Sequence, residues 1–136
     1  MDKILSHVKI IIWFFIFPVF VLFIHFFLSF FNVYEIFPWF DMPIHFLGGM
    51  AVSITYFLTL KYLQRENYLR LDNLARIIFV FALVSLTAVF WEFFEFSLTY
   101  LTGLSFQGGL DDTMLDLFFG MLGGLLAVIF LEIRKF

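Results

Sequence analysis

The sequence contains no cysteine, and only 14% of its residues are charged. The absence of cysteine excludes disulfides, thiolate catalysis and thiolate metal ligands. The 63% of apolar residues, with 24 phenylalanines, exclude an ordinary soluble enzyme and a disordered chain, because a water-soluble domain of this length cannot bury so much apolar surface. The 8 basic residues are fewer than the 11 acidic ones and form no basic stripe, so we expect no nucleic-acid partner.

Four apolar runs are long enough to cross a bilayer, which takes about 20 residues in a helix. The chain is therefore predicted to be an all-α integral membrane protein, a four-transmembrane-helix bundle that forms a single membrane domain over residues 1–136. The first run is too long for the apolar region of a signal peptide and is expected to remain as a span. The four predicted spans cover about residues 10–31, 42–60, 77–101 and 113–133.

The basic residues predict the orientation of the bundle. Connections 32–41 and 102–112 contain no Lys or Arg, and cytoplasmic loops are enriched in both. Both termini are therefore predicted to be cytoplasmic, with these two connections facing outward. The charged 61–76 connection is expected to form a short interfacial helix. The eight basic residues are Lys3, Lys9, Lys61, Arg65, Arg70, Arg76, Arg134 and Lys135.

Ionisable side chains collect in one shallow layer at the predicted outer ends of the spans, with His25 of the first span at about the same depth as the groups of the other three. His45 and Asp116 each lie four residues into a span, about 6 Å below its start. Helical spacing places these side chains in line with small residues such as Gly48 and Gly120. Small residues let membrane helices approach closely, so the ionisable faces should point into the bundle, with the second and fourth spans in contact. The set comprises Asp41, His45, Glu92, Glu95, Asp112 and Asp116.

Several neighbouring polar residues have simpler explanations. Asp41 and Asp112 stand at helix starts and are also candidates for N-caps, a role that does not exclude metal binding. Asp111 and Glu35 are expected to be solvated loop acids. His25 has no carboxylate beside it in its own span and is expected to be a hydrogen-bonded histidine rather than a ligand. Tyr34, Trp39, Trp91 and Tyr100 fit an aromatic belt at the outer interface.

Clustered carboxylates without a basic partner need another source of neutralisation. The outer half of the chain has no Lys or Arg, so either some acids are protonated or a cation binds. Histidine with carboxylates suits zinc, manganese or iron, and carboxylates with water suit magnesium or calcium. The predicted cofactor is a divalent metal ion, with zinc, manganese, iron and magnesium as candidates. Its predicted ligands are Asp41, His45, Glu92, Glu95, Asp112 and Asp116, and the predicted catalytic residues are Glu92 and Glu95.

Three motifs resemble those of the YjdF-like inner membrane protein family. The resemblance covers about residues 41–124 and implies a bacterial-type inner membrane protein, with no established activity. The chain departs from the family pattern at Gly109 and Asp111, where an acid and an aromatic residue are usual. The motifs are Asp41-x-x-x-His45-Phe46-x-Gly48, Trp91-Glu92-x-x-Glu95, and Gln107-Gly108 followed by Asp112-Thr113-x-x-Asp116.

Three functions of different classes follow from the cluster. The first is a metal-dependent membrane enzyme of the hydrolase type, acting on a lipid headgroup or another substrate from the outer leaflet, with Glu92 or Glu95 as base. The second is a cation- or proton-coupled transporter. The third is a structural or accessory membrane protein with a stabilising ion. The lipid bilayer is the expected partner in all three, and the cluster is expected to face the extracytoplasmic side of the plasma (inner) membrane.

Overall fold

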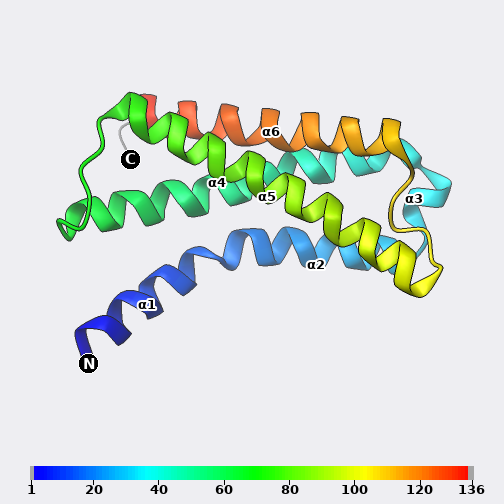
Figure 1. The fold of residues 1–136 in the computed structure, drawn as a ribbon, viewed down its shortest axis with the longest axis horizontal. Helices are drawn as coiled ribbons and strands as arrows, with labels where there is room; N and C mark the ends of the chain where they lie inside the picture. The colour runs from blue at the N-terminus through cyan, green and yellow to red at the C-terminus, as the bar shows by residue number, and fades with distance from the viewer. Residues whose placement is uncertain (1, 135–136) are drawn as a thin grey trace.

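The structure, a computed structural model, describes residues 2–134 and is helical throughout, with no strand in that range (Figure 1). Four of its segments are long and apolar enough to cross a membrane: His7–Phe30, Pro38–Arg65, Asn73–Thr102 and Leu110–Ile133. The predicted four-span helical fold is therefore confirmed. The elements are α1 (Asp2–Phe14), α2 (Ile16–Phe30), α3 (Val33–Ile36), the short 3-10 helix η1 (Pro38–Phe40), α4 (Asp41–Arg65), α5 (Asn73–Thr102) and α6 (Leu110–Ile133).

The helix ends differ from the predicted spans in one connection. The second span was expected to end near residue 60, with a separate helix in the charged 61–76 segment. That expectation is wrong, because α4 continues without a break to Arg65. Helix α5 then begins after Asp72, whose side chain caps it by accepting a hydrogen bond from the backbone N–H of Ala75 at 2.7 Å. Lys135, one of the residues used to predict orientation, lies outside the described part of the chain.

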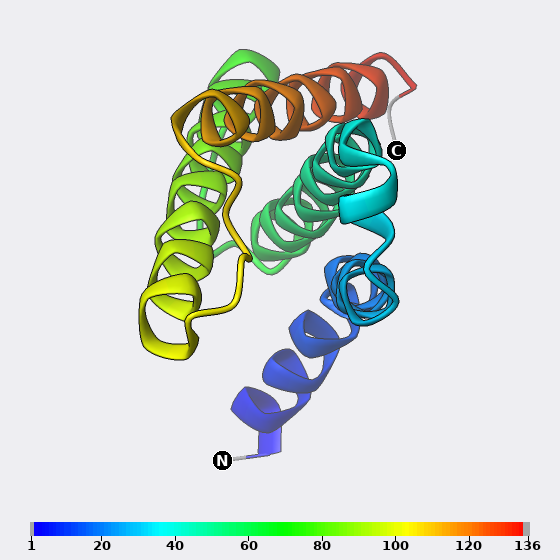
Figure 2. The same cartoon turned by 90° about the vertical axis from the view of Figure 1, so that its right-hand side faces the viewer.

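Helix α4 is the central element of the bundle. It contacts α2, α5 and α6, and the view along the helices places it between them (Figure 2). Phe57 and Leu60 of α4 form the buried core with Val80 and Val84 of α5 and Val128 of α6. Large apolar side chains cover most of the outer surface, as expected for helices that face lipid.

Glycines bring α4 and α6 into backbone contact. A Cβ atom on Gly49 would overlap the carbonyl group of Gly120, and one on Gly123 would overlap the carbonyl group of Phe46. Ser53 of α4 also donates its hydroxyl to the carbonyl oxygen of Gly124 at 2.8 Å. The predicted contact between the second and fourth spans is thus confirmed, and it fixes the distance between the two helices that carry His45 and Asp116.

The first span is broken at Phe15, between α1 and α2. Pro18 has no N–H, so the carbonyl oxygen of Phe14, one turn earlier, loses its usual helical partner. The hydroxyl of Thr55 in α4 donates to this oxygen at 2.8 Å instead. The break therefore ties the first span to the central helix at a point inward of the ionisable cluster.

The end of the bundle away from the cluster holds one buried basic side chain. Arg76 is 4% exposed and pairs with both carboxylate oxygens of Glu132, one of them at 3.0 Å from Nη2. Its guanidinium also donates to the side-chain oxygens of Gln64 and Asn73. Each nitrogen of the guanidinium donates at least one hydrogen bond, and the pair joins α5 to α6, so Arg76 contributes to packing as well as to the basic side of the protein.

Candidate metal centre

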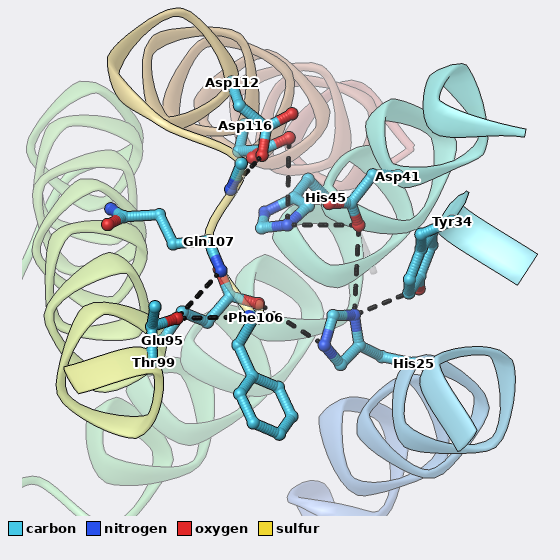
Figure 3. A network of polar contacts seen from close by, with 11 residues as sticks. His25, Tyr34, Asp41, His45, Glu95, Thr99, Phe106, Gln107, Asp112 and Asp116 are labelled. Atoms are coloured by element: carbon cyan, nitrogen blue, oxygen red, sulfur yellow. Dashed lines mark hydrogen bonds and ion pairs between the residues drawn. The ribbon is translucent and has the colours of Figure 1, made fainter. Parts of the chain in front are cut away.

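Ionisable side chains from four helices meet between α2, α4, α5 and α6, beside α3 (Figure 3). Helix α2 contributes His25, α4 contributes Asp41 and His45, α5 contributes Glu92 and Glu95, and α6 contributes Asp116. We call these six residues the outer cluster. Four of them are less than 9% exposed: His25 5%, Glu92 6%, Glu95 3% and Asp116 2%.

One group of candidate ligands surrounds the Nε2 atom of His45. This atom lies 3.5 Å from Oδ1 of Asp41, one turn earlier in α4, and 3.8 Å from Oδ1 of Asp116 in α6. Asp41, His45 and Asp116 each offer an atom within 4.8 Å of the others. Two carboxylates and one imidazole at this spacing are close enough to share a single ion.

A second group uses the same histidine. His45, Glu92 and Glu95 also offer atoms that all lie within 4.8 Å of one another. Glu92 and Glu95 are three residues apart in α5 and therefore share one helix face. The predicted ligands thus form two groups of three with His45 in common, an arrangement compatible with one ion and a nearby free carboxylate or with two neighbouring ions.

The outer cluster contains buried polar atoms that have no hydrogen-bond partner. In native proteins such atoms are rare, because each one costs free energy when it is removed from water. Asp41 is the first residue of α4, and its Oδ1 caps no backbone N–H, so the simpler N-cap interpretation does not account for this atom. The unpartnered atoms among the described residues are Oδ1 of Asp41, Nε2 of His45, Oε2 of Glu92, Oε1 of Glu95 and Oδ1 of Asp116.

His25 belongs to the outer cluster, where its expected role is that of a hydrogen-bonded histidine rather than a ligand. Its Nε2 atom lies 3.4 Å from Oε1 of Glu95, and its Nδ1 atom lies 3.9 Å from Oδ1 of Asp41. A hydrogen bond of 3.1 Å joins the same Nδ1 to the hydroxyl of Tyr34 in α3. His25 is therefore both hydrogen-bonded, as expected, and in contact with two predicted ligands.

Tyr34, which the sequence predicts in the aromatic belt, also contacts the cluster through His25. Burial raises the pKa of the Tyr34 phenol above its usual range, and the carboxylates of Asp41, Glu95 and Asp116 raise it further. Tyr34 therefore remains a neutral hydroxyl beside His25. Tyr34 lies nine residues after His25, beyond the end of α2, so helical periodicity does not predict their contact.

Asp112 lies at the rim and belongs to neither group of three. Its Oδ2 atom accepts a hydrogen bond of 3.0 Å from the backbone N–H of Gly108, just before α6. Asp111 is exposed as predicted, but it lies in the first turn of α6 and not in the loop, because α6 begins at Leu110. The loop is held further by Gln107, which donates its side-chain amide to the hydroxyl of Thr113 at 2.8 Å. Asp112 thus shapes the loop over the outer cluster, and its role as a ligand stays a prediction.

The fold and the cluster define a small helical membrane protein with ionisable residues buried between its spans. A family model described as "Predicted membrane protein (DUF2238)" matches residues 3–135, and the chain belongs to this family. The predicted resemblance to the YjdF-like family is confirmed, because the two are the same family.

A relative from Thermotoga maritima carries the description "Uncharacterized protein". It is 38% identical over 97 residues, which make up 70% of this chain and 48% of the relative, so the chain spans about half the length of this protein. No solved structure matches the chain.

Proposed function

We propose that the outer cluster binds a divalent metal ion and that the protein is a metal-dependent membrane hydrolase. The observation that carries the proposal is the set of five buried, unpartnered ligand atoms contributed by α4, α5 and α6. A bound cation would give each of these atoms a partner. Zinc, manganese, iron and magnesium are the candidates, and the imidazole ligand favours the first three.

The distribution of charge supports a cation at this position. No Lys or Arg occurs in residues 10–60 or 77–133, so no basic side chain from these segments can neutralise the four carboxylates of the outer cluster. An ionised carboxylate out of water costs several kcal/mol unless it is paired. Protonation of some carboxylates is the alternative to a bound cation. Direct measurement of bound metal distinguishes these two explanations.

The two groups of three suggest a division of roles. Asp41, His45 and Asp116 would hold the ion, since α4 and α6 are locked together at Gly49 and Gly120. Glu92 and Glu95 would then remain free to accept a proton from the attacking water. A bound metal supplies a water of lowered pKa, and this is the chemistry that the buried carboxylates alone lack.

The proposal includes an orientation and a location. We infer that both termini are cytoplasmic and that the outer cluster faces the extracytoplasmic side of the plasma (inner) membrane, because the connections 32–41 and 102–112 beside the cluster contain no Lys or Arg. The shallow position of the cluster suits a substrate from the outer leaflet. A phosphate group there would depend on the metal, on backbone N–H groups or on the hydroxyl of Thr113, since basic side chains are missing.

Transport is less well supported. A cation crossing the bundle would need polar groups inward of the cluster, as transporters usually have. The hydroxyls of Tyr56 and Thr87 bond each other at 2.9 Å, and the core around Phe57 fills the space below them. A structural role with a stabilising ion remains the other alternative, and the loss of activity in a metal-loaded variant would argue against it.

The proposed function is tested by hydrolysis assays on the purified protein in mixed detergent–phospholipid micelles, with zinc, manganese, iron or magnesium added. We expect metal-dependent release of a product from the headgroup, and a loss of at least about 100-fold in Glu92→Gln or Glu95→Gln with metal content retained. Glu66→Gln, at the opposite end of the bundle from the outer cluster, is the matched control and should keep full activity. Equal activity in all these proteins, or none with any metal, would contradict the proposal.

A further inference from the structure

A cavity of about 190 Å³ begins at the outer cluster and extends inward between α2, α4, α5 and α6. His25 and His45 stand at its outer end. An apolar cavity of about 150 Å³ is large enough to hold benzene, so this one can hold a short stretch of hydrocarbon. The wall below the histidines is mainly apolar and includes Val21, Leu22, Gly48, Val52, Val84 and Ala88.

The cavity runs parallel to the helices. In α2 its lining extends from His25 back to Pro18, and in α5 from Trp91 back to Val84. Each of these stretches rises about 10 Å along its helix. In α4 the lining extends over a similar length, from Ile44 to Val52. The cavity therefore follows the direction in which an acyl chain runs through a bilayer, from the outer surface toward the middle.

The cavity reaches the lipid-facing surface on the side of α2 and α5. Leu22, which lines it, is 39% exposed, and Trp91 and Ala88 are partly exposed. Helix α2 packs mainly on α4, while its link to α5 includes the contacts of His25 with Glu95 and Trp91 at the outer end. Below these contacts, a hydrocarbon chain in the surrounding bilayer can enter from the side without crossing water.

We propose that this cavity holds part of an acyl chain of a bilayer phospholipid, with the lipid headgroup at the outer cluster. The unpartnered Nε2 atom of His45 and the buried His25 mark the change from apolar wall to polar site. The inference names the substrate class of the proposed hydrolase and rests on it for the headgroup chemistry. Binding of the lipid itself does not depend on that chemistry.

The charge at the rim favours a zwitterionic headgroup. Connections 32–41 and 102–112 contain Glu35, Asp41, Asp111 and Asp112 and no Lys or Arg. An ammonium group is attracted to such a rim, and a headgroup of net negative charge is repelled by it. Phosphatidylethanolamine, with one ammonium and one phosphate, is therefore the probe of choice.

The test measures binding of dioleoyl phosphatidylethanolamine to the delipidated protein in detergent, by mass spectrometry of the intact complex. We expect one lipid per chain, with no binding of glycerophosphoethanolamine, which has the headgroup but lacks the chains. Ala88→Leu fills the cavity and should weaken lipid binding at least about tenfold, the effect of about two buried methylene groups. Ala82→Leu, the same change at an exposed position of α5, should leave binding unchanged.

A second variant covers the case in which Ala88→Leu does not fold. Gly48→Val also fills the cavity, and its Cβ would meet only Val21 at 3.9 Å, an ordinary contact. Equal lipid binding in the wild type and in folded cavity-filling variants would overturn the proposal. Metal content measured on the same samples separates the two claims, because Ala88→Leu should lose lipid and keep metal. Lipid binding without any metal would contradict the proposed function and leave the cavity assignment standing.

Discussion

The imidazole of His25 lies 3.4 Å from the carboxylate of Glu95, measured from Nε2 to Oε1. This contact joins α2 to α5, two helices that both pack against α4. It places the first span at the outer cluster, where the sequence alone had indicated ligands only from the other three spans.

His25 should support the metal site without being essential to it. In the proposed centre, the ion is held by Asp41, His45 and Asp116, and His25 orients Asp41 and Glu95. We expect His25→Gln to bind the same number of metal ions with an affinity about 10- to 100-fold lower, the usual effect of an outer-shell partner. Competition with a chelator of known affinity measures this change.

The control for this prediction is the histidine at the other end of the bundle. His7 bonds the hydroxyl of Tyr62, far from the outer cluster. His7→Gln should leave metal affinity unchanged, and His45→Gln should abolish binding. A complete loss of metal in His25→Gln would show that His25 is itself a ligand.

Two adjacent glycines should respond differently to alanine. A Cβ on Gly49 would overlap the backbone carbonyl of Gly120, so Gly49→Ala must push α4 and α6 apart. We expect this change to lower the free energy of unfolding by about 1 to 3 kcal/mol, as overpacking usually does. Unfolding in mixed micelles with increasing SDS measures the difference.

Gly48→Ala is the matched control. Its Cβ would meet Val21 at 3.9 Å and nothing closer, so the side chain fits. Alanine also favours helix by about 0.5 to 1 kcal/mol over glycine, and the variant should be as stable as the wild type or more so. Equal destabilisation by both changes would mean that α4 and α6 are not in backbone contact at Gly49.

The hydroxyl of Thr55 should matter because Pro18 leaves a carbonyl without its helical partner. Thr55→Val removes the hydrogen bond to the carbonyl oxygen of Phe14 and should cost about 1 kcal/mol in the free energy of unfolding. In a Pro18→Ala background the new backbone N–H can serve this oxygen, so the same change should cost less. Unfolding of the wild type, the two single variants and the double variant gives the coupling free energy between Thr55 and Pro18.

A nearby threonine, Thr59, provides the comparison for these Thr55 and Pro18 variants. Thr59 donates its hydroxyl to the carbonyl oxygen of Thr55, within its own helix. Thr59→Val should have little effect, and the effect should not depend on Pro18. If Thr55→Val costs the same with and without Pro18, the account of the break in the first span is wrong.

The absence of cysteine makes the orientation simple to test. Single cysteines at Ser105, in the connection before α6, and at Tyr68, in the connection before α5, report on opposite ends of the bundle. Both positions are exposed. In intact spheroplasts a membrane-impermeant maleimide should label Ser105→Cys and not Tyr68→Cys, and the reverse pattern would place the outer cluster on the cytoplasmic side.

Much of the fold could be predicted because bilayer thickness sets the length of a spanning helix. The four spans follow from their apolar runs, and the contact between α4 and α6 follows from the small residues on both helices. The extension of α4 to Arg65 was missed, because a charged segment at a membrane surface can continue a helix as easily as it can end one. The pairing of Arg76 with Glu132 could not be predicted, because a basic residue near a span end indicates orientation but not its partner on another helix.

The outer cluster was partly predictable for a similar reason. Helical spacing brings His45 close to Asp41, and Glu92 close to Glu95, within single helices. It gives no information on which neighbouring helix lies opposite, so the contacts of His25 with Glu95 and of Tyr34 with His25 could not be inferred. Those contacts depend on how α2 packs against α4. The break at Phe15, between α1 and α2, affects the direction in which α2 runs along α4.

The metal content of the purified protein tests the central claim most directly. The protein is loaded with zinc, manganese, iron or magnesium in mild detergent, freed of unbound metal, and compared with Asp116→Asn and with Asp111→Asn, an exposed acid on the same helix. We predict about one or two metal ions per chain in the wild type and in Asp111→Asn, and a large loss in Asp116→Asn. A folded wild-type protein that binds none of these metals would contradict the account and would leave shared protons to neutralise the outer cluster.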